Sequence, residues 1–216
     1  GEIHAQELKV VTGANEVSPD HNTVTPIDGS GPAPAFALDV SALGGMYAGK
    51  ISLVGTEAGV GVRNAGKVVA NAGEVRITAD GKLHNSGLVH STQQTEIRTQ
   101  KGVANSGRVY ARTKVKVVTQ ANIDKSALIG AQEDTTLIAE GETSRIDSSA
   151  GSMLIAGLNP DGTTGVTGTL TMTAEEHLHA GGVNQAAEKI AASSPVISLG
   201  GSTTAAPIIQ LDALPA

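Results

Sequence analysis

The sequence contains no cysteine, and only Phe36, Tyr47 and Tyr110 of its 216 residues are aromatic. A single thick globular core usually needs more large rings than this, and a small disulfide scaffold is excluded. The chain also lacks an apolar run near the ~20 residues that a membrane helix needs, so we expect no membrane span. Its 15 Lys and Arg residues are scattered without a basic patch, so we expect no nucleic-acid partner.

The apolar content, 39% of the chain, consists mainly of Val, Ile, Leu and Ala, and 27 residues are glycine. β-Branched residues favour strands, and small side chains suit many thin stacked layers. The chain begins in strand-like sequence without a signal segment. We therefore expect an all-β internal piece of a longer protein.

A repeat is clearest in the middle of the chain. Short Asn-x-Gly turns begin at Asn64, Asn85 and Asn105, spaced by 21 and 20 residues, and a degenerate copy begins 19 residues later at Asp124. Each interval holds three short strands with alternating apolar and polar residues, such as residues 75–78. Three strands per ~20 residues at a constant period predict a parallel β-helix, a solenoid with one repeat per coil.

The repeated asparagines predict a structural element. Asn tolerates the left-handed backbone of a sharp corner, and stacked Asn amides can pair along the axis. We expect Asn64, Asn85 and Asn105 to form such a turn ladder.

Residues 18–36 interrupt the repeat with turn-forming sequence. A long excursion from a rod is a place where recognition often occurs, which makes Asp20, His21, Asn22 and Asp28 candidate recognition residues. A loop or small hairpin without a partner is the alternative.

No catalytic motif is recognisable. His177 and His179 share a strand face but lack a third metal ligand nearby, and no local carboxylate pair or phosphate-binding loop is present. We therefore expect no metal, no cofactor and no enzyme activity. The alternative function is a carbohydrate-binding or carbohydrate-cleaving β-helix, which would need clustered carboxylates in a groove.

The segment from Ala37 to Asn64, which reads ALDVSALGGMYAGKISLVGTEAGVGVRN, is more specific than the repeat. It closely resembles the haemagglutinin-type exoproteins of bacterial two-partner secretion, which include filamentous haemagglutinin adhesins and contact-dependent growth inhibition toxins. Residues 3–5 and 10–15 are similar to the same family.

The resemblance implies a right-handed parallel β-helix with an extra-helical loop or hairpin. Residues 1–75 would be the C-terminal part of the secretion domain, with the excursion at 18–36, and residues 76–216 would be shaft repeats. It further implies a monomeric shaft or adhesin scaffold, secreted or on the bacterial surface, that presents distal receptor-binding or toxin modules. The partners would be an outer-membrane transporter and a receptor or glycan on a host or neighbouring bacterium.

Overall fold

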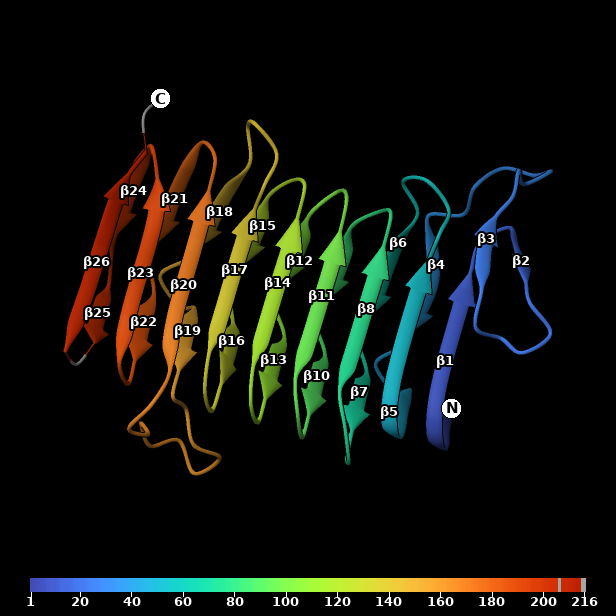
Figure 1. The fold of residues 1–216 in the computed structure, drawn as a ribbon, viewed down its shortest axis with the longest axis horizontal. Helices are drawn as coiled ribbons and strands as arrows, with labels where there is room; N and C mark the ends of the chain where they lie inside the picture. Colours follow the sequence, from blue (N-terminus) through green and yellow to red (C-terminus); the bar gives the residue numbers. More distant parts are fainter. Residues whose placement is uncertain (206, 215–216) are drawn as a thin grey trace.

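The computed structural model describes residues 1–205 and 207–214, and within them the chain forms strands and turns without any helix. The strands stack as a parallel β-solenoid from β1 at the blue end to β26 at the red end (Figure 1). The expected all-β parallel β-helix is confirmed. The described residues contain no helix long and apolar enough to cross a membrane.

Each coil contributes one strand to each of three faces. The first face is an eight-stranded parallel sheet. Its strands are β4 (Phe36–Val40), β6 (Gly61–Asn64), β9 (Leu83–Asn85), β12 (Val103–Asn105), β15 (Ile123–Lys125), β18 (Arg145–Ser148), β21 (His177–Ala180) and β24 (Val196–Leu199).

The second and third faces follow the first in every coil. The second face comprises β7 (Lys67–Ala70), β10 (Leu88–Ser91), β13 (Arg108–Ala111), β16 (Leu128–Ala131), β19 (Met153–Ala156), β22 (Val183–Ala186) and β25 (Ser202–Ala205). The third face comprises β8 (Val75–Ala79), β11 (Thr95–Thr99), β14 (Val115–Thr119), β17 (Thr135–Ala139), β20 (Thr169–Ala174), β23 (Lys189–Ser194) and β26 (Ile208–Ala213).

Two long strands join the second and third faces at the N-terminal end. The first half of β5 (Gly45–Gly55) pairs with β7 and its second half pairs with β8. β1 (Glu2–Thr12) pairs with β5 along almost its whole length. The two faces therefore form one 16-stranded sheet.

The core consists of columns of equivalent side chains, one from each coil. On the third face, alternate residues point inward, so Val75 and Ile77 are buried while Arg76 is exposed. The column through Ile77 is almost completely buried and contains Leu53, Ile77, Ile97, Val117, Leu137 and Met172. Burying one such side chain contributes about 1.5–3 kcal/mol, so the columns supply much of the stability of the rod.

Two segments leave the solenoid. β2 (Asn15–Val17) and β3 (Val24–Pro26) form an antiparallel hairpin beside β1 (Figure 1). The loop at residues 157–168 follows β19, and the Tyr110 hydroxyl donates a hydrogen bond to the Leu158 carbonyl at 3.0 Å, which holds this loop on the second face. Stacking is continuous through β8, so the domain division at residue 75 remains a prediction.

Close approach of the coils explains the glycines at one corner. A methyl group at Gly87 would lie 2.0 Å from the Gly66 carbonyl oxygen, and one at Gly107 would lie 2.1 Å from the Gly87 oxygen. These contacts are with backbone atoms of the preceding coil, so a side chain can be accommodated only if the coils separate.

We predict that Gly87→Ala lowers the free energy of unfolding by about 2–3 kcal/mol, because an added methyl group forces backbone shifts in a packed structure. Urea unfolding of the 216-residue chain measures this change. Gly31→Ala is the matched control, because an added methyl there meets no atom within 4 Å. Equal unfolding midpoints for the two variants would contradict the packing argument.

Candidate functional site

A groove of about 600 Å³ runs along the first face at the corner where the chain turns towards the second face. It crosses six coils, from Arg63 on β6 to His179 on β21. Its lining residues are Arg63, His84, Asn85, Ser86, Ala104, Asn105, Ser106, Asp124, Lys125, Ser126, Asp147, Ser148, Ser149 and His179.

The three predicted asparagines lie in register along this corner. Asn64 Nδ2 donates to Asn85 Oδ1 at 2.8 Å, and Asn85 Nδ2 donates to Asn105 Oδ1 at 2.7 Å. Asn105 Nδ2 donates to the carbonyls of Gly107 and Leu128. All three side chains are buried, so these amides hold three successive coils together.

The backbone of these asparagines differs from the expected one. Among the described residues other than glycine, only His21 has a positive φ, at 57°. The asparagines instead end first-face strands in extended conformation. Amide pairing, rather than tolerance of a left-handed corner, accounts for their recurrence.

The fourth member of the column is Lys125 and not Asp124. Lys125 pairs in register with Asn105, whereas Asp124 pairs with Ala104. The sequence repeat had placed Asp124 in the asparagine position, which is wrong by one residue. Because side chains alternate between the two faces of a strand, this shift turns Asp124 outward and Lys125 inward.

Lys125 is 4% exposed, and its Nζ lies 3.2 Å from Ser148 Oγ. Ser148 Oγ in turn lies 2.6 Å from Ser152 Oγ. Burial lowers the pKa of the Lys125 ammonium group from its usual 10.5 to about 7. A lysine at this position is therefore partly neutral near pH 7.

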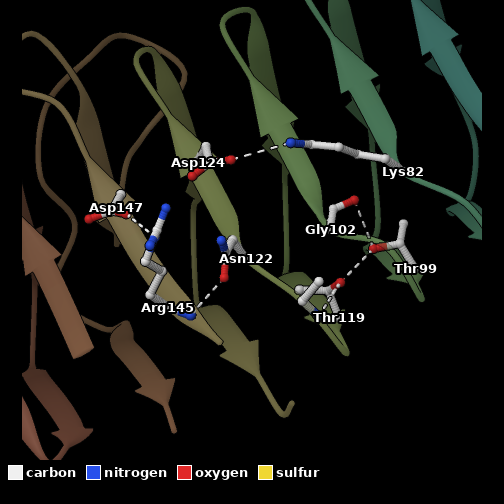
Figure 2. A network of polar contacts seen from close by, with 9 residues as sticks. Lys82, Thr99, Gly102, Thr119, Asn122, Asp124, Arg145 and Asp147 are labelled. Atoms are coloured by element: carbon white, nitrogen blue, oxygen red, sulfur yellow. Dashed lines mark hydrogen bonds and ion pairs between the residues drawn. The ribbon is translucent and has the colours of Figure 1, made fainter. Parts of the chain in front are cut away.

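The outward wall of the groove carries paired charges (Figure 2). Lys82 Nζ lies 3.3 Å from Asp124 Oδ2, and Arg145 Nε lies 2.8 Å from Asp147 Oδ2. His177 Nε2 also lies 3.2 Å from Asp147. Each carboxylate on this stretch of wall is thus already engaged with a cation.

Asp124 and Asp147 are register partners on adjacent coils. Sequence reasoning missed this pair because the two residues are separated by a coil that is longer than the repeat. Their spacing of 23 residues could have been recognised only by aligning the inward Ile123 with Ile146.

At the N-terminal end of the groove, Arg63 lies between a carboxylate and an aromatic ring. Arg63 Nε donates to Asp39 Oδ1 at 2.8 Å, and this bond holds the pKa of Asp39 below its usual value. The guanidinium of Arg63 lies 5.0 Å from the centre of the Phe36 ring, and His84 meets the same ring edge-on. Burial, together with Lys82 and Arg63, lowers the pKa of His84, so its ring is neutral at pH 7.

The candidate recognition residues of the excursion lie away from this groove. Asp20 accepts hydrogen bonds from Ser18 Oγ and Asn22 Nδ2 in the tip of the β2–β3 hairpin, and the Ser18 bond is the main cause of a lowered Asp20 pKa. The His21 carbonyl accepts a bond from Lys9 Nζ at 2.7 Å. Asp28 lies apart from the tip, on a hollow of about 630 Å³ between the hairpin and the rod.

Within residues 1–205 and 207–214, no group of three or more His, Asp and Glu side chains is arranged to hold a metal ion. His177 contacts Asp147, while His179 extends over the groove. The groove therefore offers serine hydroxyls and ion-paired side chains, with no metal centre among the described residues.

The fold and the groove define a parallel β-solenoid with a polar internal ladder. Comparison with known proteins shows which proteins have similar sequences. The chain is 44% identical over 205 residues to the tRNA nuclease CdiA-2 of Burkholderia pseudomallei, covering 94% of this chain and 6% of the relative. It is 50% identical over 102 residues to a CdiA toxin of Yersinia pestis, covering 47% and 3%. It is 46% identical over 82 residues to the 16S rRNA endonuclease CdiA of Enterobacter cloacae, covering 38% and 2%.

No family model matches the chain, and no solved structure matches it. The matches to CdiA proteins support the contact-dependent growth inhibition side of the resemblance. The names of these relatives do not mention haemagglutinins, so the resemblance to haemagglutinin-type exoproteins remains a prediction. They do not favour the alternative of a carbohydrate-active β-helix, because they name toxins and nucleases.

These names also correct two expectations. The sequence led us to expect no enzyme and no nucleic-acid partner, whereas relatives are named as tRNA nucleases and as a 16S rRNA endonuclease. The error has a simple cause. The chain spans only 2–6% of the relatives named above, so motifs and charge within it are a poor guide to the activity of such proteins.

We predict that Asn85→Ala lowers the free energy of unfolding by about 2–4 kcal/mol, because it breaks both amide bonds of the ladder and leaves the buried Asn105 Oδ1 without its donor. Asn71→Ala is the matched control, since Asn71 is exposed in a turn. Thermal or urea unfolding followed by far-UV circular dichroism measures both. A loss no larger than that of Asn71→Ala would show that the amide ladder does not stabilise the rod.

Proposed function

We propose that this chain is a segment of the β-helical rod of a contact-dependent growth inhibition exoprotein of the CdiA type. The observation that carries the proposal is the 44% identity to one CdiA protein over 94% of the chain, in a segment that folds as continuous stacked coils. For the protein as a whole, the relatives' names support a toxin with nuclease activity on tRNA or rRNA.

The rod would act as a spacer that presents receptor-binding or toxin modules at a distance from the cell that makes it. Parallel strands stack about 4.8 Å apart, so each added coil lengthens a rod by that amount. Backbone bonds, amide pairs and ion pairs such as Lys114–Asp134 link successive coils. These links support a stiff element whose length is set by the number of coils.

The finer assignments belong to the same proposal. Residues 1–75 would be the end of a secretion domain recognised by an outer-membrane transporter, and residues 76–216 would be shaft repeats on a secreted or surface-exposed protein. The hairpin tip around Asp20 would contact a receptor or glycan on a host or neighbouring bacterium. The projection of this hairpin from the rod supports that assignment (Figure 1).

A deletion in register tests the spacer role. Removing residues 85–104 from the complete exoprotein joins His84 to Asn105. His84 is the register partner of Ala104, and Asn105 is the register partner of Asn85, so the deletion removes one whole coil. We predict that surface display and inhibition of target cells in co-culture are retained within about twofold, because each strand that loses a partner meets the equivalent strand of the next coil in register.

Removal of residues 85–94 is the matched control, since it joins a first-face strand directly to the third-face strand β11. This deletion is shorter, yet we expect it to abolish display or inhibition because the register is lost. The spacer proposal is wrong if the in-register deletion abolishes inhibition while the protein still reaches the surface.

A further inference from the structure

Lys125 interrupts a column of inward-facing polar side chains. The column starts with Asn64, Asn85 and Asn105, and Lys125 follows in register on β15. The Lys125 side chain is buried to nearly the same degree as those amides. A basic group therefore occupies a place inside the rod that neutral amides occupy in the three preceding coils.

The amine has few partners there. Among the described residues, Ser148 Oγ is its one hydrogen-bond partner, at 3.2 Å. An ammonium group carries three donors, so a charged Lys125 would leave two of them unpaired in the interior. The Asn105 Oδ1 atom already accepts a bond from Asn85. This site suits a neutral amine better than an ammonium ion.

No element packed against β15 presents a charged group to the amine from inside. β12, β16 and β17 carry no titratable side chain, and Lys116 of β14 and Arg108 of β13 are exposed on the outside. The carboxylates on the first-face strands at this level are Asp124 on β15 itself and Asp147 on β18. Both lie on the outward wall, where they pair with Lys82 and with Arg145 and His177.

The turn of this coil is also held more weakly than those before it. The Asn64 and Asn85 carbonyls each accept two turn N–H groups from the next coil. Within the described chain, the Asn105 and Lys125 carbonyls each accept one, from Ser126 and Ser149. The spacing along the column also increases from 20 residues to 23 between Lys125 and Ser148.

We propose that the coil formed by β15, β16 and β17 is a pH-sensitive hinge in the rod, which opens locally when the Lys125 amine takes up a proton. Opening would expose the amine to water and separate β15 from β18, where the spacing along the column first lengthens to 23 residues. The parts of the rod on either side could then change direction relative to each other.

The direction of the pH effect follows from the two states of the amine. In the closed coil the pKa of Lys125 is about 7, and in an open, hydrated coil it returns towards 10.5. Between these values the open state binds a proton that the closed state lacks. The equilibrium constant for opening should therefore fall about tenfold for each pH unit from 7 to 10, and change little below 7.

Hydrogen exchange of the 216-residue chain tests this at pH 7, 8, 9 and 10, with exchange rates divided by the intrinsic rate at each pH. We expect protection of β15 and β18 to rise about tenfold per pH unit in the unmodified chain. In Lys125→Met, protection should be high at pH 7 and independent of pH. Lys116→Met removes an exposed charge from β14 and should keep the pH dependence of the unmodified chain.

Three results would overturn the hinge. The first is the same pH dependence in the unmodified chain and in Lys125→Met. The second is protection of β15 and β18 at pH 7 that is no lower than that of β9 and β11. The third is Lys125→Met with lower protection than the unmodified chain at pH 7, because the amine would then stabilise the closed coil.

Discussion

Every coil must lie directly over the one before it, because the backbone of each strand donates to and accepts from its equivalents in adjacent coils. The corner glycines show how little freedom this leaves, since a methyl at Gly87 would meet the Gly66 carbonyl at 2.0 Å. The same constraint turns side chains into columns. A buried amide such as Asn85 therefore meets Asn64 and Asn105 in the adjacent coils, and three separate polar residues become one bonded ladder.

A repeat of this kind makes much of the fold predictable from sequence, because the period and the alternation within strands report the stacking directly. Residues 75–78 were expected to form one strand of the repeat, and they lie in β8, which pairs with β11 of the next coil. Where the period breaks, prediction fails for physical reasons. The copy at Asp124 was displaced by one residue, since an inward lysine contradicts the usual preference of lysine for the surface. The strand β5 passes from the second face to the third between Ala48 and Ile51, and the single Gly49 there does not by itself predict a corner.

The candidate groove was harder to foresee than the coil. Its residues come from six coils, and its outward wall combines side chains, such as Lys82 and Asp124, that only stacking brings together. Of the candidate recognition residues, Asp20 and Asn22 contact each other at the hairpin tip, whereas Asp28 lies apart from them. The activity of the relatives could not be predicted from this chain at all. The relatives' names concern proteins of which this chain matches a few per cent, so local chemistry led to a wrong expectation about enzyme activity.

The ladder column also shows how a uniform rod can acquire a local property. From Asn64 to Asn105 the column holds paired amides, then Lys125 with Ser148, and finally the apolar Ala180 and Leu199. These three kinds of side chain meet the requirements of a buried position in different ways. Amides pair with one another and apolar residues pack without partners, whereas an amine depends on its protonation state. The transition between the polar and apolar parts of the column lies at Lys125 and Ser148, where the coil is also longer. Local pH sensitivity would therefore arise where the column changes from paired amides to apolar side chains. The fold around this point stays the same.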